Sequence, residues 1–221
     1  MISMSSPEPA AWWQAWLLRV YESLTRTDSV EPADLLFVMA GRMERKPYGL
    51  ELYRAGLSPL LVLSVGRFEV SRMGKLDLGD LGELMALRDK TCADDRHFFV
   101  SLDAAGIHIG KASIPRWSTY GEALALRRFL KGHPARRVLV VSTDVHLRRV
   151  ALTFASVFRN VPVEFRYCPV PSRFGFVSKD RWWTRSVDRW FVFQELMKLG
   201  GYAVILSTPA WAIRRLMRLK N

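Results

Sequence analysis

Short apolar runs alternate along the chain with longer stretches in which apolar residues recur every three or four positions. A short, wholly apolar run is typical of a strand buried on both faces of a parallel sheet, whereas the longer spacing predicts a helix with one apolar face. We expect strands at residues 35–40, 60–64, 97–102, 137–142 and 161–167, with an irregular or short extended segment at 107–114. We expect helices at residues 10–25, 44–56, 80–89, 119–131, about 147–158 and 180–199.

This alternation of strands and helices predicts an α/β domain whose mostly parallel sheet carries helices on both faces. At 221 residues, the chain has the length of one domain with helical extensions. Its hydrophobic fraction of 49% is enough to form a core, which excludes a disordered chain.

The last part of the chain is expected to contain two helices that are separated by Gly200 and Gly201. The second of them would be basic, with Thr208 as its cap and Pro209 at its first position. The inner stripe of the helix at 180–199 is expected to consist of Val187, Trp190, Phe191 and Gln194.

The charge of the chain favours an anionic partner. The formal net charge is +12, and such a balance suits nucleic acid, anionic lipid or phosphorylated metabolites. Cys92 and Cys168 form no Cys-x-x-Cys pair, so we expect reduced thiols and no metal site. With no signal peptide and no apolar run of membrane-spanning length, the sequence predicts a cytoplasmic protein.

Small and basic residues follow three of the expected strands. In sheets of this kind, ligands bind beyond the carboxyl ends of the strands. Glycines let backbone N–H groups approach an anion, and hydroxyls and arginines supply further donors to its oxygens. The sequence therefore predicts an anion site at this edge of the sheet. The residues concerned are Gly41, Arg42, Ser64, Gly66, Arg67, Thr143 and Arg149.

Two residues at the same edge suit acid–base chemistry. His146 has an imidazole that can take a proton near neutral pH, and Asp144 could orient it. Asp144 could equally cap the helix that follows. The sequence contains neither a nucleophile elbow nor a Gly-Lys-Ser/Thr phosphate loop, which excludes those two enzyme classes.

Four segments together resemble the bacterial YdcF/SanA/ElyC-like family, long described as a domain of unknown function. They are Ala33–Gly41, Leu61–Gly66 (LVLSVG), Ser118–Ala123 (STYGEA) and Leu139–Val150 (LVVSTDVHLRRV), of which the last, with His146 and Arg149 three apart, is the most specific. The chain departs from the family pattern where Arg42 follows a single Gly41 and where Val65 replaces a glycine.

The resemblance covers roughly residues 33–170 and implies a Rossmann-like three-layer sandwich with N- and C-terminal helical extensions. Residues 1–32 would then form a tail and an amphipathic helix, and residues 171–221 would complete the same domain. The resemblance also implies a role in cell-envelope or polysaccharide biogenesis with a polyprenyl phosphate or pyrophosphate as ligand, and S-adenosylmethionine as a candidate cofactor.

These considerations together assign roles to the candidate residues. Arg42, Arg67 and Arg149 would hold phosphate oxygens, while Thr119 and Thr143 would supply hydroxyl groups. His146 would act as acid or base, and Glu122 would orient it or a metal. Phosphoester or pyrophosphate hydrolysis or transfer is the reaction class that these roles fit. A non-catalytic binding module and an S-adenosylmethionine-binding protein remain the alternatives.

The terminal segments suggest a second partner. A Trp-rich N-terminal helix, together with a C-terminal helix that carries Arg214, Arg215, Arg218 and Lys220, suits the anionic inner face of the plasma membrane. Both helices could instead simply cap the sheet. The run Arg181–Arg185 interleaves arginine with tryptophan, but no nucleic-acid-binding module is recognisable, so nucleic acid is the less favoured partner. The sequence does not predict an oligomeric state.

Overall fold

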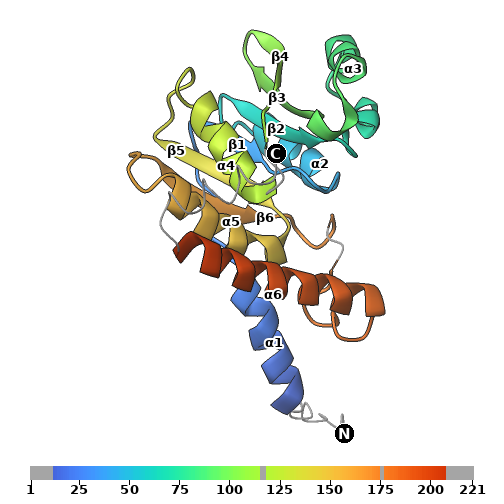
Figure 1. The fold of residues 1–221 in the computed structure, drawn as a ribbon, viewed down its shortest axis with the longest axis vertical. Coiled ribbons are helices and arrows are strands. Elements are labelled where there is room, and N and C mark those ends of the chain that lie inside the picture. The colour runs from blue at the N-terminus through green and yellow to red at the C-terminus, as the bar shows by residue number, and fades with distance from the viewer. Residues whose placement is uncertain (1–11, 115–117, 175–176, 208–221) are drawn as a thin grey trace, which may run out of the picture.

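A computed structural model of the chain describes residues 12–114, 118–174 and 177–207. They form an α/β fold around a six-stranded sheet with the order β4-β3-β2-β1-β5-β6 (Figure 1). The strands are β1 (Leu35–Val38), β2 (Leu61–Gly66), β3 (His97–Asp103), β4 (Gly106–Lys111), β5 (Arg137–Ser142) and β6 (Glu164–Pro169). The strands β2, β1, β5 and β6 run parallel, which confirms a mostly parallel core.

The other two strands make the sheet mixed. β3 pairs antiparallel with β2, and β4 pairs antiparallel with β3. The segment expected to be irregular or a short strand is thus a regular edge strand. Gly106, with φ +127°, lies in the tight turn between β3 and β4, and a turn this short joins antiparallel neighbours.

Helices cover both faces of the sheet because consecutive residues of the central strands point to opposite sides. Leu36 and Val38 pack with α2 (Arg45–Arg54), η1 (Val70–Lys75) and α3 (Gly82–Asp89). Leu35 and Phe37 pack with α4 (Ser118–Phe129) and α5 (Asp144–Val157). This double burial explains why β1 reads as an unbroken apolar run.

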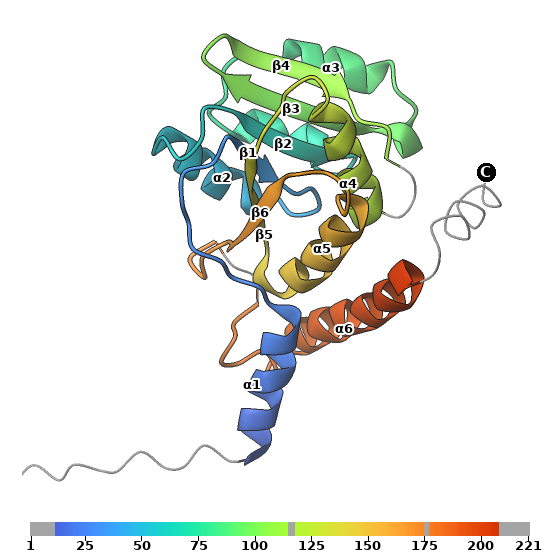
Figure 2. The same cartoon turned by 90° about the vertical axis from the view of Figure 1, so that its left-hand side faces the viewer.

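The helices α1 (Trp12–Leu24) and α6 (Ser186–Ser207) lie at the end of the molecule away from α3 and β4 (Figures 1 and 2). They pack on α5 through a separate core that contains Tyr21, Val145 and Val192. Among the helices that the structure describes, none has the length and apolarity needed to cross a membrane.

The helix α6 departs from expectation in three ways. It begins at Ser186 and not at residue 180, because residues 179–184 form turns. It continues through Gly200 and Gly201, since a helical glycine costs only about 1 kcal/mol relative to alanine and Tyr202 beyond them packs inward. Its inner stripe was also partly wrong, because Val187 and Trp190 are 53% and 61% exposed. The side chains that are buried there instead are Asp188, Val192 and Glu195.

The other predicted helices and strands lie where the sequence placed them, apart from one to three residues at their ends. The proposed basic helix with Thr208 and Pro209 lies outside the described residues, as does the N-terminal tail to residue 11.

Candidate functional site

A cleft of about 970 Å³ opens beyond the carboxyl ends of β1, β2 and β5. Of the predicted site residues, the structure brings the following to its walls: Gly41, Arg42, Gly66, Arg67, Thr119, Glu122, His146 and Arg149. Ser64 and Thr143 lie just behind them and bond to lining side chains. The basic lining residues are Arg42, Arg45, Arg67, Arg96, Arg149 and Lys198, and they outnumber the carboxylates of Asp94, Asp95, Glu122 and Glu195 by two.

The backbone donors of the strand-end loops are already occupied. Glu69, which the sequence analysis did not select, accepts hydrogen bonds at Oε2 from the N–H groups of Gly41 and Gly66, both at 2.9 Å. Glu122 accepts the N–H of Ala40 at 2.8 Å. The expectation that these glycine loops cradle a phosphate is therefore not met in this structure. Glu69 follows Gly66 by three residues, a spacing at which a carboxylate can reach back to a backbone N–H.

Glu122 does not contact His146. Its Oε1 atom instead accepts the hydroxyl of Ser64 at 2.6 Å, in addition to the N–H of Ala40. Among the described residues, no group of three or more histidine, cysteine or acidic side chains is arranged to hold a metal ion.

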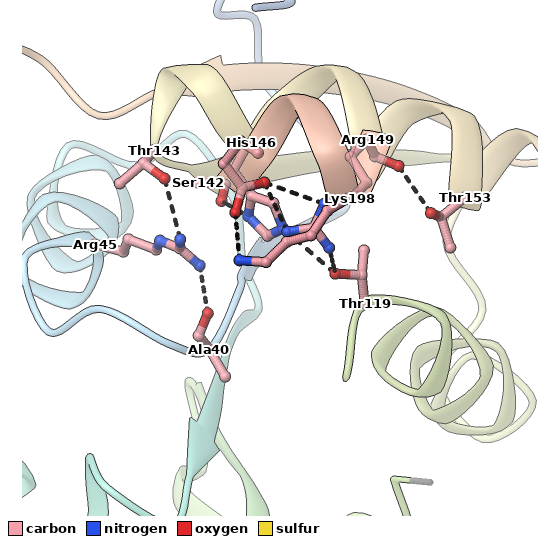
Figure 3. Close-up of polar contacts among 10 residues, drawn as sticks. Ala40, Arg45, Thr119, Ser142, Thr143, His146, Arg149, Thr153 and Lys198 are labelled. Carbon is pink, nitrogen blue, oxygen red and sulfur yellow. Dashed lines mark hydrogen bonds and ion pairs between the residues drawn. The ribbon is translucent and has the colours of Figure 1, made fainter. Parts of the chain in front are cut away.

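His146 is held by hydroxyl groups deep in the cleft (Figure 3). Its Nδ1 lies 2.8 Å from Ser142 Oγ, and its Nε2 lies 3.3 Å from Thr119 Oγ1. Burial lowers the pKa of the imidazole well below its usual value, and three nearby cations lower it further: Arg149, Arg45 and Lys198. The ring is therefore neutral at pH 7. Thr119 Oγ1 also accepts a hydrogen bond from Arg149 Nη1.

Asp144 points elsewhere. Its carboxylate accepts the hydroxyl of Tyr21 on α1 and the N–H of Val145 at 2.8 Å. No hydrogen bond between described residues joins it to His146, so the predicted acid–base pair is not formed. Burial raises the pKa of the Asp144 carboxyl, although the two hydrogen bonds partly oppose this. Asp144 thus ties α1 to the start of α5.

Arg149 is neutralised by a carboxylate from α6. Its Nε and Nη2 lie 3.1 and 2.8 Å from Glu195 Oε2, and Nη1 donates to Thr119 at 2.5 Å. Lys198 donates to the other oxygen of Glu195 at 2.9 Å (Figure 3). Glu195 was not among the predicted site residues, because it lies on a helix far along the chain from the strand ends where those residues were sought. Arg149 thus already has an anionic partner inside the protein.

Arg45, at the start of α2, has no such partner. It is 4% exposed; Nη1 donates to the carbonyl of Ala40 and Nη2 to Thr143 Oγ1 at 3.1 Å. Its Nε has no hydrogen-bond partner, and no carboxylate of the described residues is within ion-pair distance. Burial lowers the pKa of the guanidinium to about 10, which leaves it charged at neutral pH. The sequence analysis missed Arg45 because it lies several residues past β1.

The two remaining predicted arginines lie at the rim. Arg67 pairs with Asp94 at 2.6 Å and stacks over Phe68, with 4.4 Å from its guanidinium carbon to the ring centre. Arg42 stacks over Phe191 at 4.6 Å. An exposed ion pair such as that of Arg67 with Asp94 is weak, so the Arg67 side chain can turn toward an anion in the cleft.

A second imidazole lines the cleft without having been predicted. His97 Nε2 lies 2.7 Å from Ser64 Oγ, which donates its own proton to Glu122. Ser64 Oγ must therefore accept a hydrogen bond from the Nε2–H group of His97. In the neutral ring, Nδ1 then carries no proton and can act as an acceptor. Burial lowers the pKa of His97, which favours the neutral ring. His97 is the first residue of β3 and pairs with Gly66, the last residue of β2. Its position at the start of a predicted strand is the only sign of it in the sequence.

Comparisons of the chain with models of known protein families, with curated proteins and with solved structures find no match. The resemblance noted from the four sequence segments therefore stays a prediction. The candidate site rests on its own geometry.

Proposed function

We propose that the cleft binds a phosphate-bearing ligand, with Arg45 at its base. The observation that carries this proposal is the buried guanidinium of Arg45, which lines the cleft without an ion-pair partner. A buried charge is costly unless it is paired. A ligand oxygen placed against the guanidinium would supply a negative charge that no carboxylate of the described residues provides at ion-pair distance.

The balance of charge supports a ligand with about two negative charges. The basic side chains of the cleft outnumber its carboxylates by two. A phosphate monoester or a pyrophosphate meets that excess, whereas a monocarboxylate does not. Arg42 and Arg67 at the rim would contact the outer oxygens. Since Glu69 holds the N–H groups of Gly41 and Gly66, recognition would depend on side chains.

The sequence resemblance supports a narrower ligand class. Polyprenyl phosphate or pyrophosphate would place its head group near Arg45 and its first isoprene units beside Ile114, Phe68 and Phe191, which also line the cleft. The resemblance further favours a Rossmann-like description of the fold, a cytoplasmic location and a role in envelope or polysaccharide biogenesis. S-adenosylmethionine carries no phosphate, and the single negative charge of its carboxylate is outweighed by its own ammonium and sulfonium groups, so it fits a basic cleft poorly.

If the cleft hydrolyses the ligand, the two neutral imidazoles are the groups suited to move protons. The free Nδ1 of His97 can accept a proton from an attacking water molecule. The leaving oxygen would depart with a negative charge that Arg45 and Arg149 offset. Equal binding with no phosphate release would make the protein a non-catalytic binding module.

Titration calorimetry with pyrophosphate, inorganic phosphate, a short-chain polyprenyl phosphate and S-adenosylmethionine tests the proposal. We expect Arg45→Gln to weaken pyrophosphate binding at least tenfold. The matched control is Arg54→Gln, which removes an exposed arginine from the other end of α2 and should leave binding unchanged. Equal affinity of Arg45→Gln and the parent, or binding of S-adenosylmethionine alone, would contradict the proposal.

A further inference from the structure

The outward face of α6 carries a row of large apolar side chains. They recur at intervals of three, four and seven residues, which places them on one side of the helix. Each is more than half exposed: Val187, Trp190, Phe193, Met197 and Val204. We call these five residues the α6 stripe. An ordinary surface helix turns its apolar residues inward and its charged residues to water, so this arrangement is unusual.

The charges of α6 are also distributed in an unusual way. Its two carboxylates, Asp188 and Glu195, are buried at 0% and 3% exposure. The charged residues of α6 that reach the surface are Arg189 and Lys198, and both are basic. Arg181 and Arg185, just before the helix, are exposed as well. The outward face of α6 is therefore apolar along its length and positive at its edges.

A second group of aromatic side chains lies at the same end of the molecule. Trp12 and Trp16 of α1 are 82% and 60% exposed. The helices α1 and α6 meet at this end (Figures 1 and 2). The ring centres of Trp13, on α1, and Trp183, just before α6, lie 6.1 Å apart. Tryptophan is favoured where one side of a ring faces hydrocarbon and the other faces water.

We propose that the α6 stripe docks on the surface of an anionic lipid bilayer, with α6 lying in the plane of the interface. The helix α6, of 22 residues, is apolar on its outer face as well as on its packed face, so its outer face is expected to be covered by an apolar phase. The positive edges select an anionic surface. A second copy of the chain would bring Arg189 and Lys198 against the same basic residues, so charge opposes that occupant. The net charge of +12 adds long-range attraction to the bilayer.

The same helix forms a wall of the cleft. Phe191, Glu195 and Lys198 line the cleft, whereas Trp190, Phe193 and Met197 point away from it. Docking would therefore hold the cleft about one helix diameter, ~10 Å, from the bilayer. This link to a lipid phosphate rests on the proposed function, but the docking itself does not.

Co-sedimentation of the full chain with vesicles tests the proposal. The vesicles are phosphatidylcholine alone and phosphatidylcholine with one third phosphatidylglycerol. We expect binding to the anionic vesicles, and a loss of at least tenfold in affinity when Trp190→Ser, Phe193→Ser and Met197→Ser are combined. The control is Val30→Ser, which removes an exposed apolar side chain from the segment between α1 and β1. It should bind like the parent, and circular dichroism checks that both variants fold.

Several outcomes would overturn the proposal. They are a parent chain that does not sediment with anionic vesicles, equal binding to both kinds of vesicle, and a triple variant that binds as well as the parent. Light scattering that shows a dimer which the triple variant dissolves would assign the stripe to a second copy instead. Arg45→Gln should still bind vesicles, and the triple variant should still bind pyrophosphate in solution, so the two proposals can fail separately.

Discussion

Arg45 and Lys46 are neighbours at the start of α2, and both are buried, but only one of them has a carboxylate. Lys46 Nζ lies 2.8 Å from Glu69 Oε1 and donates to the carbonyl of Met39 at 2.9 Å. Arg45 bonds only to a carbonyl and a hydroxyl group. Lys46 is therefore held in a buried ion pair, whereas Arg45 has only the more distant charges of Glu69, Glu122 and Glu195 to offset its own.

The two residues should accordingly respond differently to substitution. Lys46→Gln leaves the buried Glu69 carboxylate without its cation, and we expect it to lower the free energy of unfolding by about 3–5 kcal/mol. We expect the free energy of unfolding of Arg45→Gln to lie within about 1 kcal/mol of the parent value or above it, because the substitution removes a buried charge that has no ion-pair partner. Urea denaturation without phosphate in the buffer measures both. A loss of several kcal/mol in Arg45→Gln would mean that Arg45 is structural.

The ion pair between Arg149 and Glu195 sets how strongly the cleft attracts anions. Glu195→Gln removes a carboxylate from the cleft wall and leaves Arg149 and Lys198 uncompensated. We expect pyrophosphate affinity to rise and the free energy of unfolding without ligand to fall by about 3–5 kcal/mol. Calorimetry and denaturation together measure the two effects.

The exposed pair of Glu51 with Arg173 provides a control for that substitution. Both side chains are at least half exposed, so Glu51→Gln should change the free energy of unfolding by less than about 1 kcal/mol and leave pyrophosphate affinity unchanged. If Glu195→Gln weakened pyrophosphate binding, the carboxylate would be a ligand contact and not a competitor.

Replacement of two helical glycines by alanine should change the free energy of unfolding in opposite directions. A Cβ atom at Gly49 in α2 would lie well inside van der Waals contact with Val38 Cγ2 on β1, whose branched side chain has little freedom to move. We expect Gly49→Ala to lower the free energy of unfolding by about 1–3 kcal/mol. A Cβ atom at Gly200 in α6 would have no atom within 4 Å, so Gly200→Ala should raise the free energy of unfolding by up to about 1 kcal/mol. Thermal denaturation compares the two; destabilisation by Gly200→Ala would argue against a continuous α6.

The buried His146 should make the fold sensitive to acid. Its pKa in the folded chain lies well below the usual value near 6.5, so below that pH the unfolded chain binds the proton more tightly. Stability is then fully present above about pH 6.5 and falls as the pH is lowered through the range below it. The slope is at most about 1.4 kcal/mol per pH unit for one group. His97 acts in the same direction.

Denaturation between pH 7 and pH 5 tests this effect. His146→Gln should flatten the fall in the free energy of unfolding. His133→Gln is the control, because that imidazole is exposed to water in the folded and the unfolded chain. An identical pH slope for the parent and His146→Gln would mean that folding does not lower the pKa of His146.

The fold was largely predictable from sequence because burial on both faces leaves a local signal. Strands such as Leu35–Val38 are apolar at every position, and that pattern depends on no distant residue. The direction of β3 left no such signal. An antiparallel strand buried in the middle of a sheet has the same composition as a parallel one, and only the short turn at Gly106 distinguishes them.

The site was predictable only where its residues directly follow strands. Arg149 and Thr119 lie in the cleft as expected, but Glu195, which pairs with Arg149, lies 46 residues further along the chain on α6. The pairing of Glu195 with Arg149 also accompanies the burial of a different side of α6 from the predicted one. Hydrophobic periodicity predicted that Trp190 faces inward, whereas in the structure Glu195 is buried beside Arg149 and Trp190 is exposed. Sequence periodicity accounts for hydrophobic burial but not for a buried ion pair.

The carboxylate of Glu69 has a kinetic consequence. It fixes the loops after β1 and β2 to each other through the N–H groups of Gly41 and Gly66. The entropy of ordering these loops is therefore lost when the chain folds and not when a ligand arrives. An anion that enters the cleft meets walls that are already in place at its base, and only the rim arginines still have to find their rotamers. Association would then be governed by diffusion and electrostatic steering, and selectivity among anions would reside in the rate at which each one leaves.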